Sequence, residues 1–133
     1  MKVAISRGLL EQIMSEAAAD RREVCGLLLG TRARIEAVRP AANVAADPER
    51  HFELDPVVLI AAHRAARAGG ARILGHYHSH PAGQAAPSRT DAACAAPDDS
   101  LWLIVGEGMA RLWVAGAGQD GRVQFVEALL DIM

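Results

Sequence analysis

Three histidines alternate with other residues in the stretch GHYHSHP at positions 75–81, the part of the sequence with the clearest capacity for chemistry. In a β-strand, alternate side chains project from the same face, so His76, His78 and His80 are expected to lie side by side. Imidazoles at positions i and i+2 of a strand are close enough to share a single ion. The spacing therefore predicts a metal-binding pair at the end of a strand that Pro81 terminates.

A carboxylate follows at a distance that allows it to return to these histidines. A loop of small residues, 82–87, leads into the sequence SRTD at positions 88–91, which opens a predicted short helix. A chain that turns sharply after a strand and comes back through a helix can bring a carboxylate of the first helical turn over the end of that strand. Asp91 could therefore supply a third ligand.

Two imidazoles and one carboxylate form a common set of zinc ligands, with metal–ligand distances of about 2.0–2.2 Å and a fourth position left for water. Structural zinc sites are instead closed by four protein ligands, so an open position indicates catalysis. Bound zinc lowers the pKa of water from about 15.7 to roughly 7, which makes hydroxide available at neutral pH. Such a site still needs a base to accept and deliver the proton.

This pattern resembles the JAMM (MPN+) metallopeptidases, which share a glutamate ahead of an apolar strand, then HSHP, about six residues, and S-x-x-D. Here the glutamate is Glu23, followed by VCGLLLG, and the two other motifs stand at 78–81 and 88–91 with the six residues 82–87 between them. The order and rough length of the intervening elements also match, so the resemblance covers nearly all of the chain.

The resemblance implies a role for each matching position. His78, His80 and Asp91 would ligate one zinc ion, and Glu23 would be the general base that holds the attacking water and shuttles its proton. Ser88 would donate a hydrogen bond to the oxyanion of the tetrahedral intermediate. The fold implied is a single JAMM/MPN-like domain of the cytidine-deaminase-like kind.

The resemblance also implies a substrate class. The reaction would be hydrolysis of the isopeptide or peptide bond after the C-terminal glycines of a ubiquitin-like protein, and the short chain is similar to compact prokaryotic members, some of which process ubiquitin-like sulfur carriers. We hypothesise that a diglycine tail pairs with an exposed edge of the strand at 71–79 by β-addition. Two alternatives remain: a non-catalytic MPN scaffold, and a DNA-associated protein of the RadC type, which has a similar HxHP strand.

Each motif taken alone has an ordinary structural explanation. Ser88 and Asp91 fit a helix capping box, an HxH pair on a strand is often only hydrogen-bonded, and an isolated Glu23 would be a solvated acid at a turn. Their joint occurrence at matching spacing favours the zinc site. His76 lies outside the motif, and we interpret it as supporting a ligand or lining the pocket, with a structural histidine as the alternative.

Hydrophobic periodicity predicts an α/β (α+β) domain that spans 1–133, with a mostly antiparallel mixed sheet flanked by helices. Residues 40–54 lack a period and are expected to form a loop with a short extended piece at 51–54. The remaining elements are strands at 2–6, 24–30, 33–39, 71–79, 101–105, 109–115 and 122–128, and helices at 7–19, 55–68 and 88–96.

Composition narrows the class of protein. Of the 133 residues, 51% are apolar but only 4% are aromatic, which predicts one domain with an aliphatic core. The net charge is −2 and the basic residues are scattered, so no nucleic-acid partner is expected. No apolar run approaches the roughly 18 residues of a membrane span, and no signal-peptide pattern is present, which predicts a cytoplasmic protein with no membrane partner.

Overall fold

The computed structural model describes residues 1–133, and its ten elements follow the predicted order. The boundaries differ from prediction mainly at the last strand, which continues to Ile132. The elements are β1 (Lys2–Ile5), α1 (Arg7–Ala18), β2 (Cys25–Thr31), β3 (Arg34–Ala41), α2 (Pro56–Arg67), β4 (Arg72–Ser79), α3 (Arg89–Cys94), β5 (Leu101–Gly106), β6 (Met109–Ala117) and β7 (Val123–Ile132).

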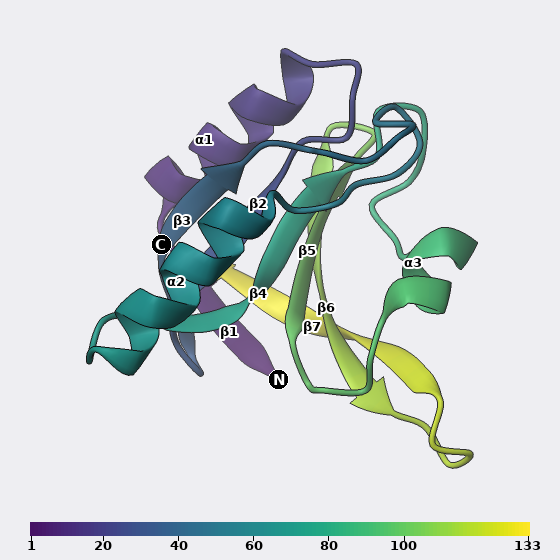
Figure 1. The fold of residues 1–133 in the computed structure, drawn as a ribbon. Coiled ribbons are helices and arrows are strands. Elements are labelled where there is room, and N and C mark those ends of the chain that lie inside the picture. Colours follow the sequence, from purple (N-terminus) through teal and green to yellow (C-terminus); the bar gives the residue numbers. More distant parts are fainter.

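The strands form one mixed sheet that closes into a barrel in the order β1-β3-β2-β4-β5-β6-β7 (Figure 1). The pairs β2–β3, β2–β4, β5–β6 and β6–β7 are antiparallel, as the prediction of a mostly antiparallel sheet requires. The pairs β1–β3, β1–β7 and β4–β5 are parallel. Closure was not predicted from the sequence, and it depends on β1, which joins β3 to β7.

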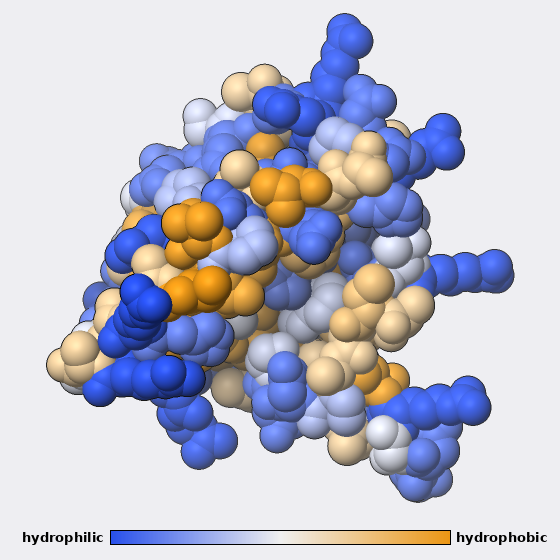
Figure 2. Space-filling model, in the orientation of Figure 1, coloured by the Kyte–Doolittle hydropathy of each residue, from blue (hydrophilic) through white to orange (hydrophobic).

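The helices begin where the sequence supplies capping groups. Ser6 Oγ accepts a hydrogen bond from the backbone N–H of Leu9, and Asp55 caps α2 ahead of Pro56 at the first helical position. In Figure 1, α1 and α2 lie on one side of the barrel strands and α3 on the other. Figure 2 shows apolar side chains over α2, where Val57 and Ile60 are exposed. None of the helices is long and apolar enough to cross a membrane.

The barrel interior holds the aliphatic core that the composition predicts. Every strand contributes buried side chains to it, among them Val3, Ile5, Leu28, Ile35, Leu103, Leu112 and Ala128. The one aromatic ring among them is Tyr77 of β4, whose hydroxyl donates to Glu16 of α1 at 3.0 Å. Because Tyr77 points into the core, its neighbours His76 and His78 must point to the outer face of the strand.

Strand β4 has partners on both sides, which contradicts the exposed edge expected at 71–79. It pairs with β2 from Arg72 to His78 and with β5 from Gly75 to Ser79. Only residues 72–74 lack a β5 partner, and they lie at the end of the strand away from His78 and His80. The hypothesis of β-addition to this strand beside the histidines is therefore wrong, because their backbone groups are already paired within the barrel.

A glycine at the end of β5 lets the loop after the histidines lie close to the barrel. A Cβ atom on Gly106 would lie 2.4 Å from the carbonyl oxygen of Gly83 and 2.7 Å from the nitrogen of Ala85. These are backbone atoms, which cannot rotate away as a side chain can. The residue type at 106 therefore controls where the loop 82–87 sits.

We expect Gly106→Ala to lower the free energy of unfolding by about 1–3 kcal/mol, because the new methyl group forces the loop outward. The matched control is Gly8→Ala in α1, where a Cβ would meet nothing within 4 Å. That change should raise stability by about 0.5 kcal/mol, since alanine favours the helix. Urea denaturation of both variants measures the two effects, and equal shifts in the same direction would contradict the explanation.

Candidate active site

The end of β4 and the first turn of α3 bring two imidazoles and a carboxylate together. The Nε2 atoms of His78 and His80 are 3.1 Å apart, and Asp91 Oδ2 lies 3.2 Å from the first and 3.1 Å from the second. All three side chains are buried or nearly so. The structure thus brings together the three side chains that the sequence proposed as metal ligands, from the two elements expected to carry them.

A capping box aims the Asp91 carboxylate at the histidines. Ser88 Oγ accepts from the backbone N–H of Asp91 at 3.0 Å, while the backbone N–H of Ser88 donates to Asp91 Oδ2 at 2.9 Å. Burial acts to raise the pKa of Asp91, but hydrogen bonds from His78, His80 and Ser88 outweigh it and hold that pKa well below its usual range. Asp91 therefore takes part in the capping box of α3 and, at the same time, contacts both histidines. The capping explanation of the S-x-x-D motif and the proposed ligand role of Asp91 are thus compatible.

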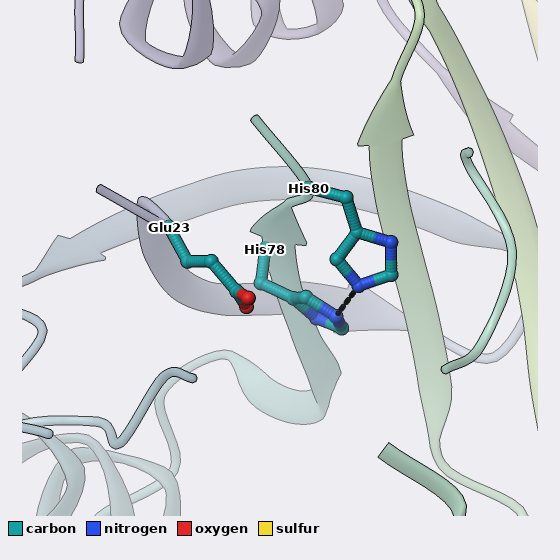
Figure 3. Close-up of side chains that lie close together, drawn as sticks. All are labelled: Glu23, His78 and His80. Atoms are coloured by element: carbon teal, nitrogen blue, oxygen red, sulfur yellow. Dashed lines mark hydrogen bonds between the residues drawn. The ribbon is translucent and has the colours of Figure 1, made fainter. Parts of the chain in front are cut away.

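Glu23 lies beside the cluster, just before β2, and is 6% exposed. A carboxylate oxygen of Glu23 and one ring nitrogen from each of His78 and His80 lie within 4.8 Å of one another, and Figure 3 shows the three side chains converging. Burial raises the pKa of Glu23 to about 7, although the nearby His80 opposes the shift. Glu23 is therefore not a solvated acid at a turn.

The backbone around Glu23 is tied to the histidine strand. The N–H of Val24 donates to Ser79 Oγ at 2.9 Å, and the N–H of Ser79 donates to the carbonyl of Val24 at 3.0 Å. On the other side, the N–H of Glu23 donates to the carbonyl of Pro48 at 2.7 Å. Ser79, between the two histidines, thus holds the glutamate at a set distance from them.

His80 is oriented through its second ring nitrogen. His80 Nδ1 lies 2.7 Å from the carbonyl oxygen of Gln84, and a carbonyl can only accept, so Nδ1 carries the hydrogen. With its hydrogen on Nδ1, the neutral ring leaves the Nε2 lone pair for a metal ion, whereas a further hydrogen on Nε2 would make the ring a donor to Asp91. The loop that supplies this carbonyl is itself held by Trp113, whose Nε1 donates to the carbonyl of Ala85 at 3.0 Å.

The donor set fits a single zinc ion. Two ligands at about 2.0–2.2 Å from a tetrahedral ion are separated by roughly 3.3–3.6 Å, and the donor atoms of His78, His80 and Asp91 lie 3.1–3.2 Å apart. An outward movement of a few tenths of an ångström would complete the geometry. Imidazole nitrogen and carboxylate oxygen are also ligand types that zinc accepts.

A cleft of about 440 Å³ opens beside this cluster. Glu23, His80 and Ser88 line it, together with Glu49, Arg50 and most residues of the loop 81–87. A second cavity of about 670 Å³ lies between α2, β4 and the start of β5, and His76 is among its lining residues. The reactive groups therefore face solvent through the first cleft.

Two residues of the site were not predicted from the sequence. Both lie within 40–54, where no hydrophobic period indicates which side chains point toward the site. Phe52 stacks on the ring of His78, with centroids 4.2 Å apart and planes at 18°. Asn43 forms an isolated bridge with Leu54 that closes the loop. Only the extended piece predicted at 51–54 pointed toward an ordered segment here.

Asn43 binds five backbone groups and joins Glu23 to the loop. The two hydrogens of its side-chain nitrogen serve three carbonyl oxygens, those of Glu23 and His51 at 2.8 Å each and that of Pro48 at 3.2 Å, so one hydrogen is shared. Its side-chain oxygen accepts from the N–H groups of Ala45 at 3.0 Å and Glu53 at 3.1 Å. One amide therefore positions both Glu23 and the segment that carries Phe52.

Comparison with known proteins gives a consistent result. Residues 6–116 match the family model Prok-JAB, described as prokaryotic homologs of the JAB domain. The chain is 38% identical over 99 residues to a desampylase of Haloferax volcanii, covering 72% of this chain and 71% of the relative. It is also 38% identical over 121 residues to a probable TtuB-protein conjugate cleaving protease of Thermus thermophilus, covering 87% and 78%.

The fold is shared with solved structures as well. A protein of Desulfitobacterium hafniense, known from its solution structure, is 29% identical and superposes with a TM-score of 0.78, covering 98% of this chain and 94% of the other. The likeness therefore extends over the whole barrel.

We expect Asn43→Ala to destabilise the loop 44–53 by about 2–3 kcal/mol, since several hydrogen bonds of about 0.5–1.5 kcal/mol each are lost. Hydrogen exchange at the N–H groups of Ala45 and Glu53 should accelerate. In the matched variant Asn43→Asp the acceptor remains but the donors are lost, so these two N–H groups should stay protected while the Glu23 segment loosens. Unchanged exchange in Asn43→Ala would show that the amide does not hold the loop.

Proposed function

The chain belongs to the prokaryotic JAB (JAMM/MPN) family of hydrolases, and on that premise we propose that it is a zinc-dependent isopeptidase. Its substrate would be a ubiquitin-like or sulfur-carrier protein, cleaved at the bond that follows the C-terminal glycines. The observation that carries the proposal is the convergence of His78, His80 and Asp91, with Glu23 beside them. Relatives named as desampylase and as a conjugate cleaving protease support the substrate class.

In this proposal His78, His80 and Asp91 hold the zinc ion. When bound, zinc polarises the carbonyl of the scissile bond and lowers the pKa of water toward about 7. Glu23 accepts a proton from the attacking water while the water oxygen adds to the carbonyl carbon. Glu23 then delivers that proton to the departing amine as the C–N bond breaks, so the carboxylate ends the cycle as it began.

The two carboxylates are assigned by their distances and environments. Asp91 Oδ2 is within hydrogen-bonding distance of both imidazoles, and its depressed pKa keeps it ionised, as a ligand must be. Glu23 lies further from the nitrogens, and burial raises its pKa to about 7 although His80 opposes the shift, which suits a group that takes and returns a proton. The reverse assignment would leave the ionised Asp91 without a role.

The two alternative functions predict different results for zinc content and DNA binding. A non-catalytic scaffold would hold no stoichiometric zinc, whereas the donor set here is complete. A DNA-associated protein of the RadC type would show salt-sensitive DNA binding, and the scattered basic residues do not favour one.

The test uses a ubiquitin-like carrier that bears one residue beyond its diglycine, and a second carrier joined to a lysine side chain. Mass spectrometry should detect release of the carrier by the zinc-loaded protein and not by Glu23→Gln, which should still contain zinc. Asp91→Ala should lose both zinc and hydrolysis. Absence of zinc-dependent cleavage of any such carrier, or loss of zinc in Glu23→Gln, would overturn the proposal.

Ser88 should contribute to rate beyond its capping role. Its Oγ accepts from Asp91, so its hydrogen is free to donate into the cleft, where it would meet the oxyanion of the tetrahedral intermediate. Ser88→Ala should lower stability by about 1 kcal/mol through loss of the cap, and kcat by about 10²–10³-fold. Ser88→Thr keeps both groups and is the control. A fall in kcat of less than tenfold, measured well below the melting temperature, would limit Ser88 to capping.

A further inference from the structure

His78 presents its two ring nitrogens to different neighbours. Nε2 faces the cluster, 3.2 Å from Asp91 Oδ2 and 3.1 Å from His80 Nε2. Nδ1 lies on the other side of the ring, 3.1 Å from His76 Nε2. Where Nε2 binds a metal ion, the single hydrogen of the neutral imidazole must be on Nδ1, and that hydrogen needs an acceptor.

His76 is the acceptor that the structure supplies. For His76 Nε2 to accept, its own hydrogen must be on Nδ1, the nitrogen for which no protein partner is found. His76 also lines the cavity of about 670 Å³, and no buried side-chain nitrogen of the protein lacks a hydrogen-bond partner, so this unpartnered nitrogen must be accessible to solvent. The Nδ1 hydrogen of His80 has a different acceptor, the carbonyl oxygen of Gln84.

The surroundings hold the His76 ring in place for this bond. His76 stands opposite Trp102 in the β4–β5 register, and the indole meets the imidazole edge to face with centroids 4.3 Å apart. Phe52 covers both histidines, with centroids 4.9 Å from His76 and 4.2 Å from His78. The two imidazole planes are only 21° apart, so the in-plane lone pair of one ring can face the N–H of the other.

We propose that His76 is a positioning residue that accepts the Nδ1 hydrogen of His78 and so fixes the tautomer and orientation in which His78 binds zinc. The inference rests on the proposed function, since it assumes a metal ion at Nε2. Partners of this kind commonly change metal affinity by about 10–100-fold when they are removed. His76 thereby adds a contribution to the site that lies outside the motif HSHP.

The first test measures zinc affinity by competition with a chromogenic chelator. His76→Leu should weaken zinc binding about 10–100-fold. His76→Gln places a carbonyl oxygen near the position of Nε2 and should bind more tightly than His76→Leu. His63→Leu, at an exposed histidine of α2, is the matched control and should bind as wild type does. Rescue by glutamine separates hydrogen bonding from packing, because both variants lose the aromatic ring.

The second test reads the tautomers in zinc-loaded wild-type protein by nitrogen NMR of the imidazole rings. We expect His78 to carry its hydrogen on Nδ1 and His76 Nε2 to be unprotonated. A hydrogen on His76 Nε2, or a His76→Leu variant with wild-type affinity, overturns the inference while leaving the proposed function intact. Wild-type protein that holds no zinc overturns both.

Discussion

The buried carboxylate of Asp91 constrains the whole site. An ionised carboxylate withdrawn from water costs several kcal/mol unless it is paired, and no lysine or arginine forms an ion pair with it. Its neighbours are the imidazoles of His78 and His80 and the backbone N–H of Ser88. An imidazole offsets a negative charge fully only when it is protonated, and burial lowers the pKa of His78, so the arrangement favours a cation at the point where the three side chains meet.

The barrel supplies the rigidity that this arrangement needs. Strand β4 is held between β2 and β5, so the histidines project from a strand that cannot shift its register without breaking two ladders. The N–H of His80 donates to the carbonyl of Val105, and the loop that follows folds back against Gly106. Asp91 then returns at the start of α3. Each proposed ligand thus comes from a segment that is held against the barrel.

Local periodicity was sufficient to predict part of this from the sequence. Alternation placed His78 and His80 on one face, and the S-x-x-D spacing placed Asp91 in the first turn of a helix. Contacts between segments that are far apart in the sequence produce no local periodicity and could not be predicted in this way. Asn43 acts through five backbone groups in a loop without a period, and β1 and β7 carry no local sign that they will pair. The prediction of a free edge on β4 was wrong for the same reason, since alternation of side chains does not reveal which strands pair with a given strand.

Closure of the barrel also bears on how the chain folds. Val3 pairs with Leu130, and the backbone of Met133 bonds to both Ile5 and Arg7, so the seam joins residues from opposite ends of the sequence. Bringing such distant residues together carries a loop-closure entropy that slows folding. The hairpins β2–β3 and β5–β6–β7 join neighbours and can form early. We therefore expect the β1–β7 seam to form last, after the strands around the histidines have assembled.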